Sequence, residues 1–209
     1  MNDSRYLASR RKRALDVLVG GVALVLASPL LALAALAIRL ETHGHAVYRQ
    51  RRVGRGGVPF RLYKLRTMRV EADVSARWAA PDDPRITRVG TLLRRSHLDE
   101  LPQLVNVLRG EMSLVGPRAD IVEQVANYSE ADRRRLAVKP GITGWAQVRC
   151  GYAGSDTGSA WKLCHDLYYI KHRSFGLDAL ILGETIALWF RREKPLPTES
   201  AAYVLGERS

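Results

Sequence analysis

The sequence predicts an α+β protein, mostly helical, that is attached to a membrane near its N-terminus. Residues 17–38 form an uncharged apolar run of 22 residues. As a helix rising about 1.5 Å per residue, this run could cross the hydrocarbon core of a bilayer. Residues 46–68 contain two short strand patterns around a glycine-rich turn, and most of the remaining chain has helical periodicity. The 209 residues, 46% of them hydrophobic, can form one domain with a substantial core.

The chain is strongly basic, with a formal net charge of +12, and 27 of its 33 basic residues are arginines. Arginine favours planar, bidentate contact with phosphate. The charge therefore indicates an anionic partner, which could be a nucleic acid, a membrane surface or a phosphorylated small molecule. Cys150 and Cys164 do not have the spacing of a zinc site, and their number favours a reducing compartment over a disulfide scaffold.

The apolar run allows two membrane arrangements. It is followed by Arg39 rather than by a small-residue cleavage site, so we do not expect a signal peptide. Pro29 cannot donate to the carbonyl of Val25, so a bend is expected at Ser28-Pro29. Basic residues lie on both sides of the run: Arg10, Arg11, Lys12 and Arg13 before it, and Arg39, Arg49, Arg51, Arg52 and Arg55 after it. Positive charge marks the cytoplasmic side of a spanning helix. A kinked spanning helix and a re-entrant helix that breaks at Ser28-Pro29 and returns both remain open.

A second apolar segment, residues 175–190, contains Asp178, Glu184 and Thr185. Its last residues, Trp189 and Phe190, adjoin three basic residues, Arg191, Arg192 and Lys194. Aromatic residues beside basic ones are typical of a helix in the headgroup interface. A core helix with a basic C-terminal turn is an equal alternative.

The other elements follow from local patterns. Residues 46–68 predict a hairpin whose turn lies at 54–57. Residues 69–78 predict a short helix and 81–84 a turn. Further expected elements are a helix from 121 to about 127, a helix at 130–136, a loop running into a strand at 139–148, and an amphipathic helix at 161–172.

Asp99 and Glu100 are adjacent acids just before a predicted helix. Pro102 is suited to the first helical position, and Gly110 is a plausible stop. The apolar stripe between them consists of Leu101, Leu104, Val105 and Leu108. Because free N–H groups at a helix start stabilise negative charge, the pair could simply cap this helix.

The surrounding cations offer a chemical alternative. Residues able to contact phosphate lie nearby in the sequence: Lys64, Arg66, Arg85, Arg88, Arg94, Arg95 and Arg118. Two carboxylates among cations suit magnesium and phosphoryl chemistry, and a carboxylate can attack phosphorus to give an acyl phosphate. Spacing alone does not separate this hypothesis from a helix cap on a basic surface.

Beyond these patterns, the sequence resembles the bacterial sugar transferases, the monotopic phosphoglycosyl transferases that act on polyprenyl phosphate. The resemblance covers nearly the whole chain, through KRALDVLVGGVALVLASPL, RQRRVGRGGVPFRLYKLRTM, DPRITRVGTLLRRSHLDELPQLVNVLRGEMSLVGPR, KPGITGWAQV and DLYYIKHRSFGLDALILGETI. The length is similar to that of the minimal catalytic form of the family. The resemblance implies transfer of a sugar-1-phosphate from a UDP-sugar to undecaprenyl phosphate, with Mg²⁺ and with release of UMP, as the first membrane step in assembling an exopolysaccharide, capsule, O-antigen or glycoprotein.

The resemblance also implies roles for individual residues. Asp99 is implied as the nucleophile of a ping-pong reaction through a covalent phosphosugar-aspartate. Glu100 is implied to assist with magnesium or protons, and both acids are candidate metal ligands. Arg118 matches the arginine of the family's Pro-Arg-Pro motif and is expected to bind phosphate, but Ala119 replaces the second proline, which puts the rigidity of this loop in doubt. Phosphate or nucleotide contact is also expected for Lys64, Arg66 and Arg85.

For the membrane, the resemblance implies a re-entrant helix broken at Ser28-Pro29. Residues 1–40 would then be the basic N-terminus and membrane helix, and residues 41–209 a catalytic domain on the cytoplasmic face of the bacterial inner membrane. A homodimer is possible, and the sugar is not identified. No nucleic-acid partner is expected, because adjacent acids would weaken binding to a phosphate backbone. A single clear apolar segment also argues against a multi-span transferase.

Overall fold

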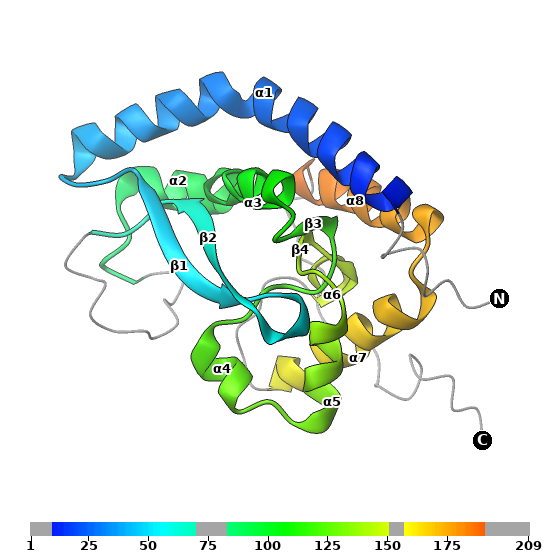
Figure 1. The fold of residues 1–209 in the computed structure, drawn as a ribbon. Helices are drawn as coiled ribbons and strands as arrows, with labels where there is room; N and C mark the ends of the chain where they lie inside the picture. Colours follow the sequence, from blue (N-terminus) through cyan, green and yellow to red (C-terminus); the bar gives the residue numbers. More distant parts are fainter. Residues whose placement is uncertain (1–9, 70–82, 151–156, 191–209) are drawn as a thin grey trace.

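The computed structural model describes residues 10–69, 83–150 and 157–190 (Figure 1). It confirms an α+β, mostly helical protein with one small antiparallel hairpin. In chain order, the elements are α1 Arg10–Glu41, β1 Val47–Val53, η1 Arg55–Gly57, β2 Pro59–Leu65, α2 Arg88–Arg95, η3 Leu98–Glu100, α3 Gln103–Arg109, β3 Ser113–Val115, α4 Val122–Ala126, α5 Glu130–Arg133, η4 Arg134–Ala137, β4 Gly141–Thr143, α6 Trp145–Cys150, α7 Thr157–His172 and α8 Phe175–Phe190.

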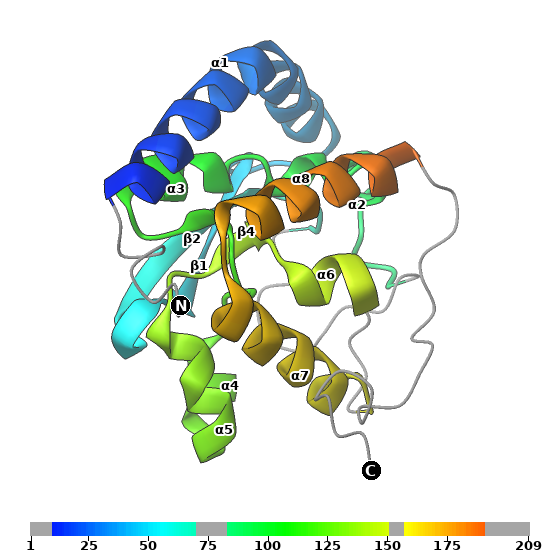
Figure 2. The same ribbon diagram turned by 90° about the vertical axis from the view of Figure 1, so that its right-hand side faces the viewer.

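Helix α1 forms an arch over the rest of the chain, with α2, α3 and α8 beneath it (Figures 1 and 2). The expected break at Ser28-Pro29 does not interrupt the helix: α1 continues through Pro29. The helix as a whole is arched (Figure 1). Pro29 leaves the carbonyl of Val25 without its helical N–H partner. The Ser28 hydroxyl donates to that carbonyl at 2.7 Å and so takes the place of the missing bond.

Both ends of α1 are fastened to the same globular body. Near the N-terminal end, the Arg13 guanidinium donates to the carbonyls of Val107 at 2.5 Å and Leu108 at 2.7 Å, in the last turn of α3. At the other end, the Glu41 carboxylate accepts from the backbone N–H groups of Arg88 at 2.7 Å and Val89 at 2.9 Å. Glu41 therefore caps α2, and Arg13 of the basic flank is a structural residue.

The outer face of α1 is an exposed apolar surface. Among the described residues, α1 is the one helix that is long and apolar enough to cross a membrane, and its apolar window is almost entirely unburied. The exposed large side chains are Val17, Leu18, Val19, Val22, Val25, Leu26, Leu30, Leu33, Leu36 and Leu40. The inner face packs through Ala34 and Ile38 against α2 and the start of the hairpin.

The hairpin has two different faces. Its antiparallel register places Arg51 opposite Arg61 and Tyr48 opposite Lys64. Because side chains alternate along a strand, Arg51 and Arg61 share the exposed outer face, whereas Tyr48 and Lys64 share the inner face with Arg52. The predicted hairpin at 46–68 is therefore confirmed.

Strand β3 pairs in parallel with β4, and this pairing brings two backbone segments into direct contact. A Cβ atom at Gly141 would lie 2.1 Å from the backbone nitrogen of Gly116, so no larger residue fits there without a shift. Gly116 donates to Thr143 O at 2.9 Å, and Gly141 donates to Pro117 O at 2.9 Å. These contacts fix the start of the loop that carries Arg118.

The remaining expectations are met in part. Helices occur at α4, in α5 with η4, and at α7, close to their expected positions. The expected strand within 139–148 is restricted to β4, because residues 145–148 belong to α6. Helix α2 and strand β3 were not predicted from the sequence. Most of the predicted helix at 69–78, residues 81–82 of the predicted turn, the side chains of Trp189 and Phe190, and the basic residues from Arg191 onward lie outside the described residues.

Asp178, a charged residue in an apolar segment, belongs to a buried ion cluster. Lys12 Nζ lies 2.8 Å from Asp16 Oδ1 and 2.7 Å from Asp178 Oδ2. Asp16 also accepts from Ser113 Oγ at 2.9 Å, and Asp178 accepts from Tyr169 OH at 2.8 Å. The cluster links α1 to β3, α7 and α8. Helix α8 turns Asp178 and Ile181 inward and leaves Phe175, Leu180 and Ile186 exposed.

Candidate active site between the hairpin and the Asp99 turn

Asp99 lies in a short turn that is held between α2 and β2. His97 has a left-handed backbone conformation with φ of 54°. The chain changes direction at this residue, between the end of α2 and the start of η3. The Asp99 side chain is directed into a buried position, and the residue is only 6% exposed. Within the described residues, its carboxylate accepts no hydrogen bond. A buried carboxylate without such partners is costly for folding and available to a ligand.

Glu100, the next residue, is held by Arg118. The guanidinium donates to both carboxylate oxygens, at 2.5 Å and 3.1 Å. Neither acid caps the following helix: in the described chain, neither carboxylate bonds to the first turn of α3, which begins at Gln103 directly after Pro102. The capping interpretation of the pair is therefore wrong.

The two acids have opposite electrostatic environments. Burial, with a further contribution from the charge of Glu100, raises the pKa of Asp99 from 3.8 to about 6, although Lys64, Arg94 and Arg118 act in the other direction. Burial also disfavours ionised Glu100, but the charge and hydrogen bonds of Arg118 outweigh it, so the pKa of Glu100 is lowered. Adjacent carboxylates with divergent pKa values are typical of groups with different chemical roles.

Two cations approach Asp99 from the elements that hold its turn. Lys64 extends from the inner face of β2; burial lowers its pKa, whereas the charges of Asp99 and Glu100 raise it. Arg94 extends from α2, and its Nε donates to Thr67 Oγ1 at 2.9 Å. The sequence shows Arg94 only as a cation near the two acids and predicts no site role for it.

A small cleft lies beside the turn, along the inner face of the hairpin. Its lining residues are Arg52, Leu62, Lys64, Glu100, Gln103, Met112, Arg118, Ala119 and Gly141. Asp99 is not among these residues but immediately precedes Glu100. The cleft therefore combines three cations with one acid that is already paired, and this composition suits an anionic group such as a phosphate.

Arg52 was not predicted as a site residue. Burial, followed by the charge of Arg118, lowers its pKa to about 10. Arg52 could have been identified from the alternation of side chains between the two faces of the predicted strands. Arg52 and Lys64 lie on the same face of the hairpin. If Lys64 is expected in a site, Arg52 is therefore expected there as well.

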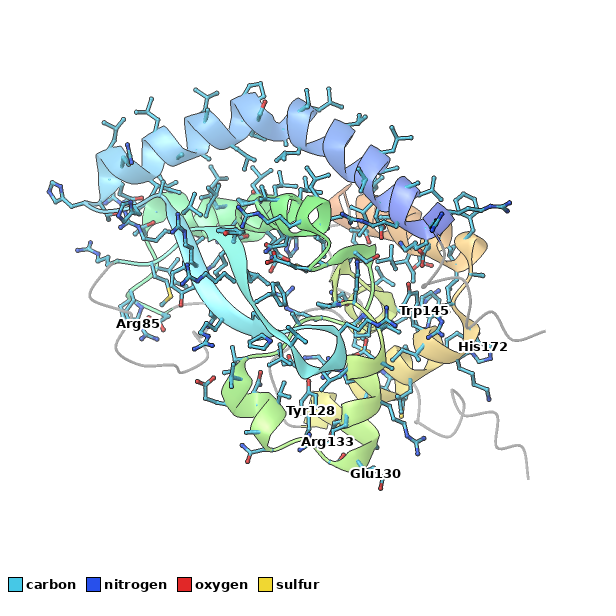
Figure 3. The ribbon with its side chains drawn as sticks, viewed as in Figure 1. Arg85, Tyr128, Glu130, Arg133, Trp145 and His172 are labelled. Atoms are coloured by element: carbon cyan, nitrogen blue, oxygen red, sulfur yellow. The ribbon has the colours of Figure 1, made fainter. Side chains whose placement is uncertain are left out.

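The structure does not bring Arg66 to the cleft. Its guanidinium donates to His43 O at 2.6 Å and to Thr42 O at 2.9 Å, in the turn that follows α1. Arg85 lies at the edge of the molecule (Figure 3) and forms an ion pair of 2.6 Å with Asp83. Phosphate contact by Arg85 stays a prediction.

The loop at Arg118 has Ala119 in place of the family's second proline, and several hydrogen bonds restrain its backbone. Arg52 Nη1 donates to Ala119 O at 2.9 Å, and Arg135 Nη2 donates to Arg118 O at 3.3 Å. Val53 N–H donates to Asp120 O at 3.0 Å. Arg135 is itself fixed by Asp120, Tyr128 and Asp166. Arginine contacts from two sides thus restrain the loop although the second proline is absent.

A magnesium ion at this site would depend on substrate phosphates as well as on the two acids. In the described part of the chain, no group of three or more His, Cys, Asp and Glu side chains could hold a metal. Mg²⁺ commonly takes only one or two protein carboxylates and completes its coordination with water and phosphate oxygens. The side chains that would hold such an ion are Asp99, which has no hydrogen bond from described residues, and Glu100, whose two oxygens already accept from Arg118. Magnesium binding stays a prediction.

Comparison with known proteins identifies close relatives. Residues 7–192 match the family model described as bacterial sugar transferase. The chain is 44% identical over 182 residues to a protein of Aeromonas hydrophila named UDP-N-acetylgalactosamine-undecaprenyl-phosphate N-acetylgalactosaminephosphotransferase. It is also 44% identical over 188 residues to the UDP-glucose:undecaprenyl-phosphate glucose-1-phosphate transferase of Caulobacter vibrioides, and 36% identical over 198 residues to the exopolysaccharide production protein ExoY of Rhizobium meliloti.

The matched regions cover different shares of these proteins. They include 84%, 87% and 87% of this chain, but 42%, 70% and 86% of the Aeromonas, Caulobacter and Rhizobium proteins, respectively. The chain thus spans less than half of the first relative. The two relatives of equal identity are named for different sugars, so overall similarity does not identify a sugar for this chain.

Proposed function

The chain belongs to the bacterial sugar transferase family, and from this premise we propose that it transfers a sugar-1-phosphate from a UDP-sugar to undecaprenyl phosphate and releases UMP. The observation that carries the proposal is the Asp99 carboxylate, which is buried, free of hydrogen bonds from described residues and adjacent to a cationic cleft. A nucleophile for phosphorus needs an oxygen that is not occupied by other donors, with cations nearby to offset the charge of the phosphoryl group.

The reaction is proposed to follow a ping-pong route. The Asp99 carboxylate attacks the sugar-bearing phosphorus of the donor, and the bond from that phosphorus to the bridging oxygen breaks. The bridging oxygen keeps the electron pair and leaves as part of UMP. A phosphate oxygen of the lipid then attacks the phosphosugar-aspartate, and the phosphorus–carboxylate bond breaks to restore Asp99.

The neighbouring residues support both steps. Lys64 and Arg94 offset negative charge near Asp99, and Glu100 orients Arg118 through its two hydrogen bonds. A magnesium ion, when bound by Asp99 and Glu100 with the donor phosphates, would supply further charge neutralisation. The lowered pKa of Glu100 keeps its carboxylate ionised, so that it can pair with Arg118.

The membrane arrangement is proposed to be monotopic, with the cleft on the cytoplasmic side of the bacterial inner membrane. Both ends of α1 bind the same body, through Arg13 and Glu41. A spanning helix would place these ends on opposite sides of the bilayer and break one set of contacts. The exposed apolar faces of α1 and α8 would enter one leaflet. The glycoconjugate pathway and a homodimer stay predictions.

The proposed reaction is tested by measuring UMP release from a panel of UDP-sugars, with undecaprenyl phosphate and magnesium. Release that depends on the lipid and on one donor would support the reaction and identify the sugar. Incubation with that donor alone, followed by mass spectrometry of the intact protein, should detect one phosphosugar per chain. Absence of UMP release from every donor, in protein with a cooperative unfolding transition, would contradict the proposal.

The rate of the first half-reaction should depend on pH through the ionisation of the Asp99 carboxylate. Only the ionised carboxylate can attack, and the pKa of this group is raised to about 6. We expect the rate of UMP release, measured in a single turnover without lipid, to fall as pH decreases through about 6. An unperturbed aspartate would keep the rate constant down to about pH 4, so a constant rate between pH 7 and pH 5 would contradict the role of Asp99.

Pro29→Ala should change the membrane arrangement of α1. Alanine restores the helical hydrogen bond to Val25 and removes the cause of the bend. We expect part of the protein to adopt a spanning orientation. An N-terminal cysteine, introduced as Ser4→Cys, would then react with a membrane-impermeant maleimide in intact spheroplasts.

The control for this prediction is Ser28→Ala. It removes the hydroxyl bond to Val25 but keeps the proline, so the N-terminus should stay protected until the cells are lysed. Equal protection of the N-terminus in the Pro29→Ala protein would show that the proline does not determine the orientation. The parent protein, with only Cys150 and Cys164, gives the background labelling.

A further inference from the structure

We propose that Arg52 binds the phosphate of the UMP half of the donor, on the side of the cleft away from Asp99, and stabilises UMP as it leaves. This assignment rests on the proposed function and adds a specific residue to it. Arg52 lines the cleft together with Lys64 and Arg118.

The guanidinium of Arg52 is held in place by neutral acceptors. Its Nε and Nη2 donate to Gln50 Oε1 at 3.0 Å and 2.7 Å, and its Nη1 donates to Ala119 O at 2.9 Å. The amide oxygen thus receives two donors of the guanidinium in the way that a carboxylate would, but without a charge. The group is positioned before any ligand arrives.

The positive charge of Arg52 has no carboxylate partner in the described part of the chain. Within the described residues, no carboxylate lies within ion-pair distance of Arg52, whereas Arg118 in the same cleft is paired with Glu100. Largely buried charges are normally paired, because desolvation is costly. The lowered pKa of Arg52 has the same origin, in burial and in the nearby charge of Arg118. An anion at this position would relieve both effects.

The direction of the hairpin favours the soluble donor over the lipid as the source of this anion. Strand β1 starts soon after α1 and leads away from it (Figure 1). Lys64 is opposite Tyr48 near that start, and Arg52 is opposite Phe60, four residues further along β1. At about 3.3 Å per residue, the backbone positions of the two residues are roughly 13 Å apart along the strand, although both side chains reach the same cleft. A lipid phosphate must remain near the headgroups on the α1 side, so the far position suits the nucleotide.

This placement explains how Arg52 would act in the reaction. When the bond from the bridging oxygen to the sugar-bearing phosphorus breaks, the electron pair stays on the oxygen of UMP. The phosphate of UMP thereby gains negative charge. The Arg52 guanidinium, which is already oriented, would stabilise that charge as it forms and would also contribute to binding of the intact donor.

The test compares Arg52→Gln with Arg51→Gln in the full-length protein. Arg51 is the matched control, because it directly precedes Arg52 in the same strand but lies on the exposed outer face. We expect Arg52→Gln to lower kcat/KM for the UDP-sugar by about 10- to 100-fold and to weaken UMP binding, measured by calorimetry, by a similar factor. Its kcat/KM for undecaprenyl phosphate should not change. Arg51→Gln should match the wild type in all three measurements.

Three outcomes would overturn the assignment. Equal losses with both substrates would mean that Arg52 acts by positioning the Arg118 loop through Ala119. A loss confined to undecaprenyl phosphate would identify the lipid as the source of the phosphate. Unchanged UMP affinity in Arg52→Gln would exclude nucleotide binding. Arg52→Lys keeps the charge but cannot donate two hydrogen bonds to Gln50, so it should recover part of the UMP affinity. If the Arg52→Gln protein fails to fold, the Arg52→Lys protein should still fold and allow the same measurements.

Failure of the proposed function would be distinguishable from failure of this inference. If the wild type releases no UMP from any donor, the function fails, and calorimetry still tests Arg52 because it does not depend on turnover. If the wild type is active and Arg52→Gln equals Arg51→Gln, the inference alone fails.

Discussion

Asp99→Asn is expected to abolish lipid-dependent UMP release, with a loss of about a thousandfold or more. Asparagine has nearly the same shape as aspartate but cannot form an acyl phosphate. Its amide fits the site without breaking a hydrogen bond, because the Asp99 carboxylate accepts none from the described residues. The loss should therefore arise from the chemistry and not from misfolding.

The controls for this prediction separate charge from position. Glu123→Gln removes an exposed acid from α4 and should leave UMP release unchanged. Mass spectrometry should detect the phosphosugar on the wild type and on Glu123→Gln but not on Asp99→Asn. Near-normal UMP release by Asp99→Asn would exclude Asp99 as the nucleophile.

The same variant should be more stable than the wild type at neutral pH. The folded-state pKa of Asp99 is raised from 3.8 to about 6, so the folded state binds its proton more tightly than the unfolded state does. The wild type therefore loses stability as pH rises through this window, and the asparagine variant does not. The difference between their unfolding temperatures should grow from pH 4 to pH 7. The ionised Asp99 carboxylate thus lowers the free energy of unfolding at neutral pH.

Sequence patterns predicted the parts of the site that depend on local structure. Alternation and the glycine-rich turn defined the hairpin, and Pro102 with Gly110 located α3 to within one residue. The failure at Arg66 has a local cause. Arg66 has the same parity as Lys64, but β2 ends at Leu65, and beyond the strand the alternation no longer fixes the direction of a side chain. Its guanidinium instead binds the end of α1.

Other features depended on partners far away in the sequence. The capping interpretation of Glu100 failed because Arg118, 18 residues later, binds its carboxylate. Lys12 was interpreted as part of a basic flank, yet it is buried with Asp16 and Asp178. No local pattern distinguishes a lysine that faces lipid headgroups from one that pairs with a distant aspartate.

Lys12→Met is expected to cause the largest loss of stability, about 3–5 kcal/mol, because it leaves buried carboxylates without their cation. Asp16 and Asp178 are each only 4% exposed, so water cannot replace the missing charge without opening the structure. Arg10→Met is the matched control, since Arg10 lies at the same end of α1 but is exposed. Denaturant unfolding of the protein in detergent micelles should show the loss only for Lys12→Met.

A second substitution tests whether the cluster acts through charge pairing. Adding Asp178→Asn to Lys12→Met removes one of the stranded charges, while Asp16 keeps its hydrogen bonds from Ser113 Oγ and Leu114 N–H. The double variant should therefore be more stable than Lys12→Met alone. If the two were equally destabilised, lost packing and not the unpaired charge would be the cause. Because Ser113 begins the strand that leads to the Arg118 loop, UMP release should recover in the double variant together with stability.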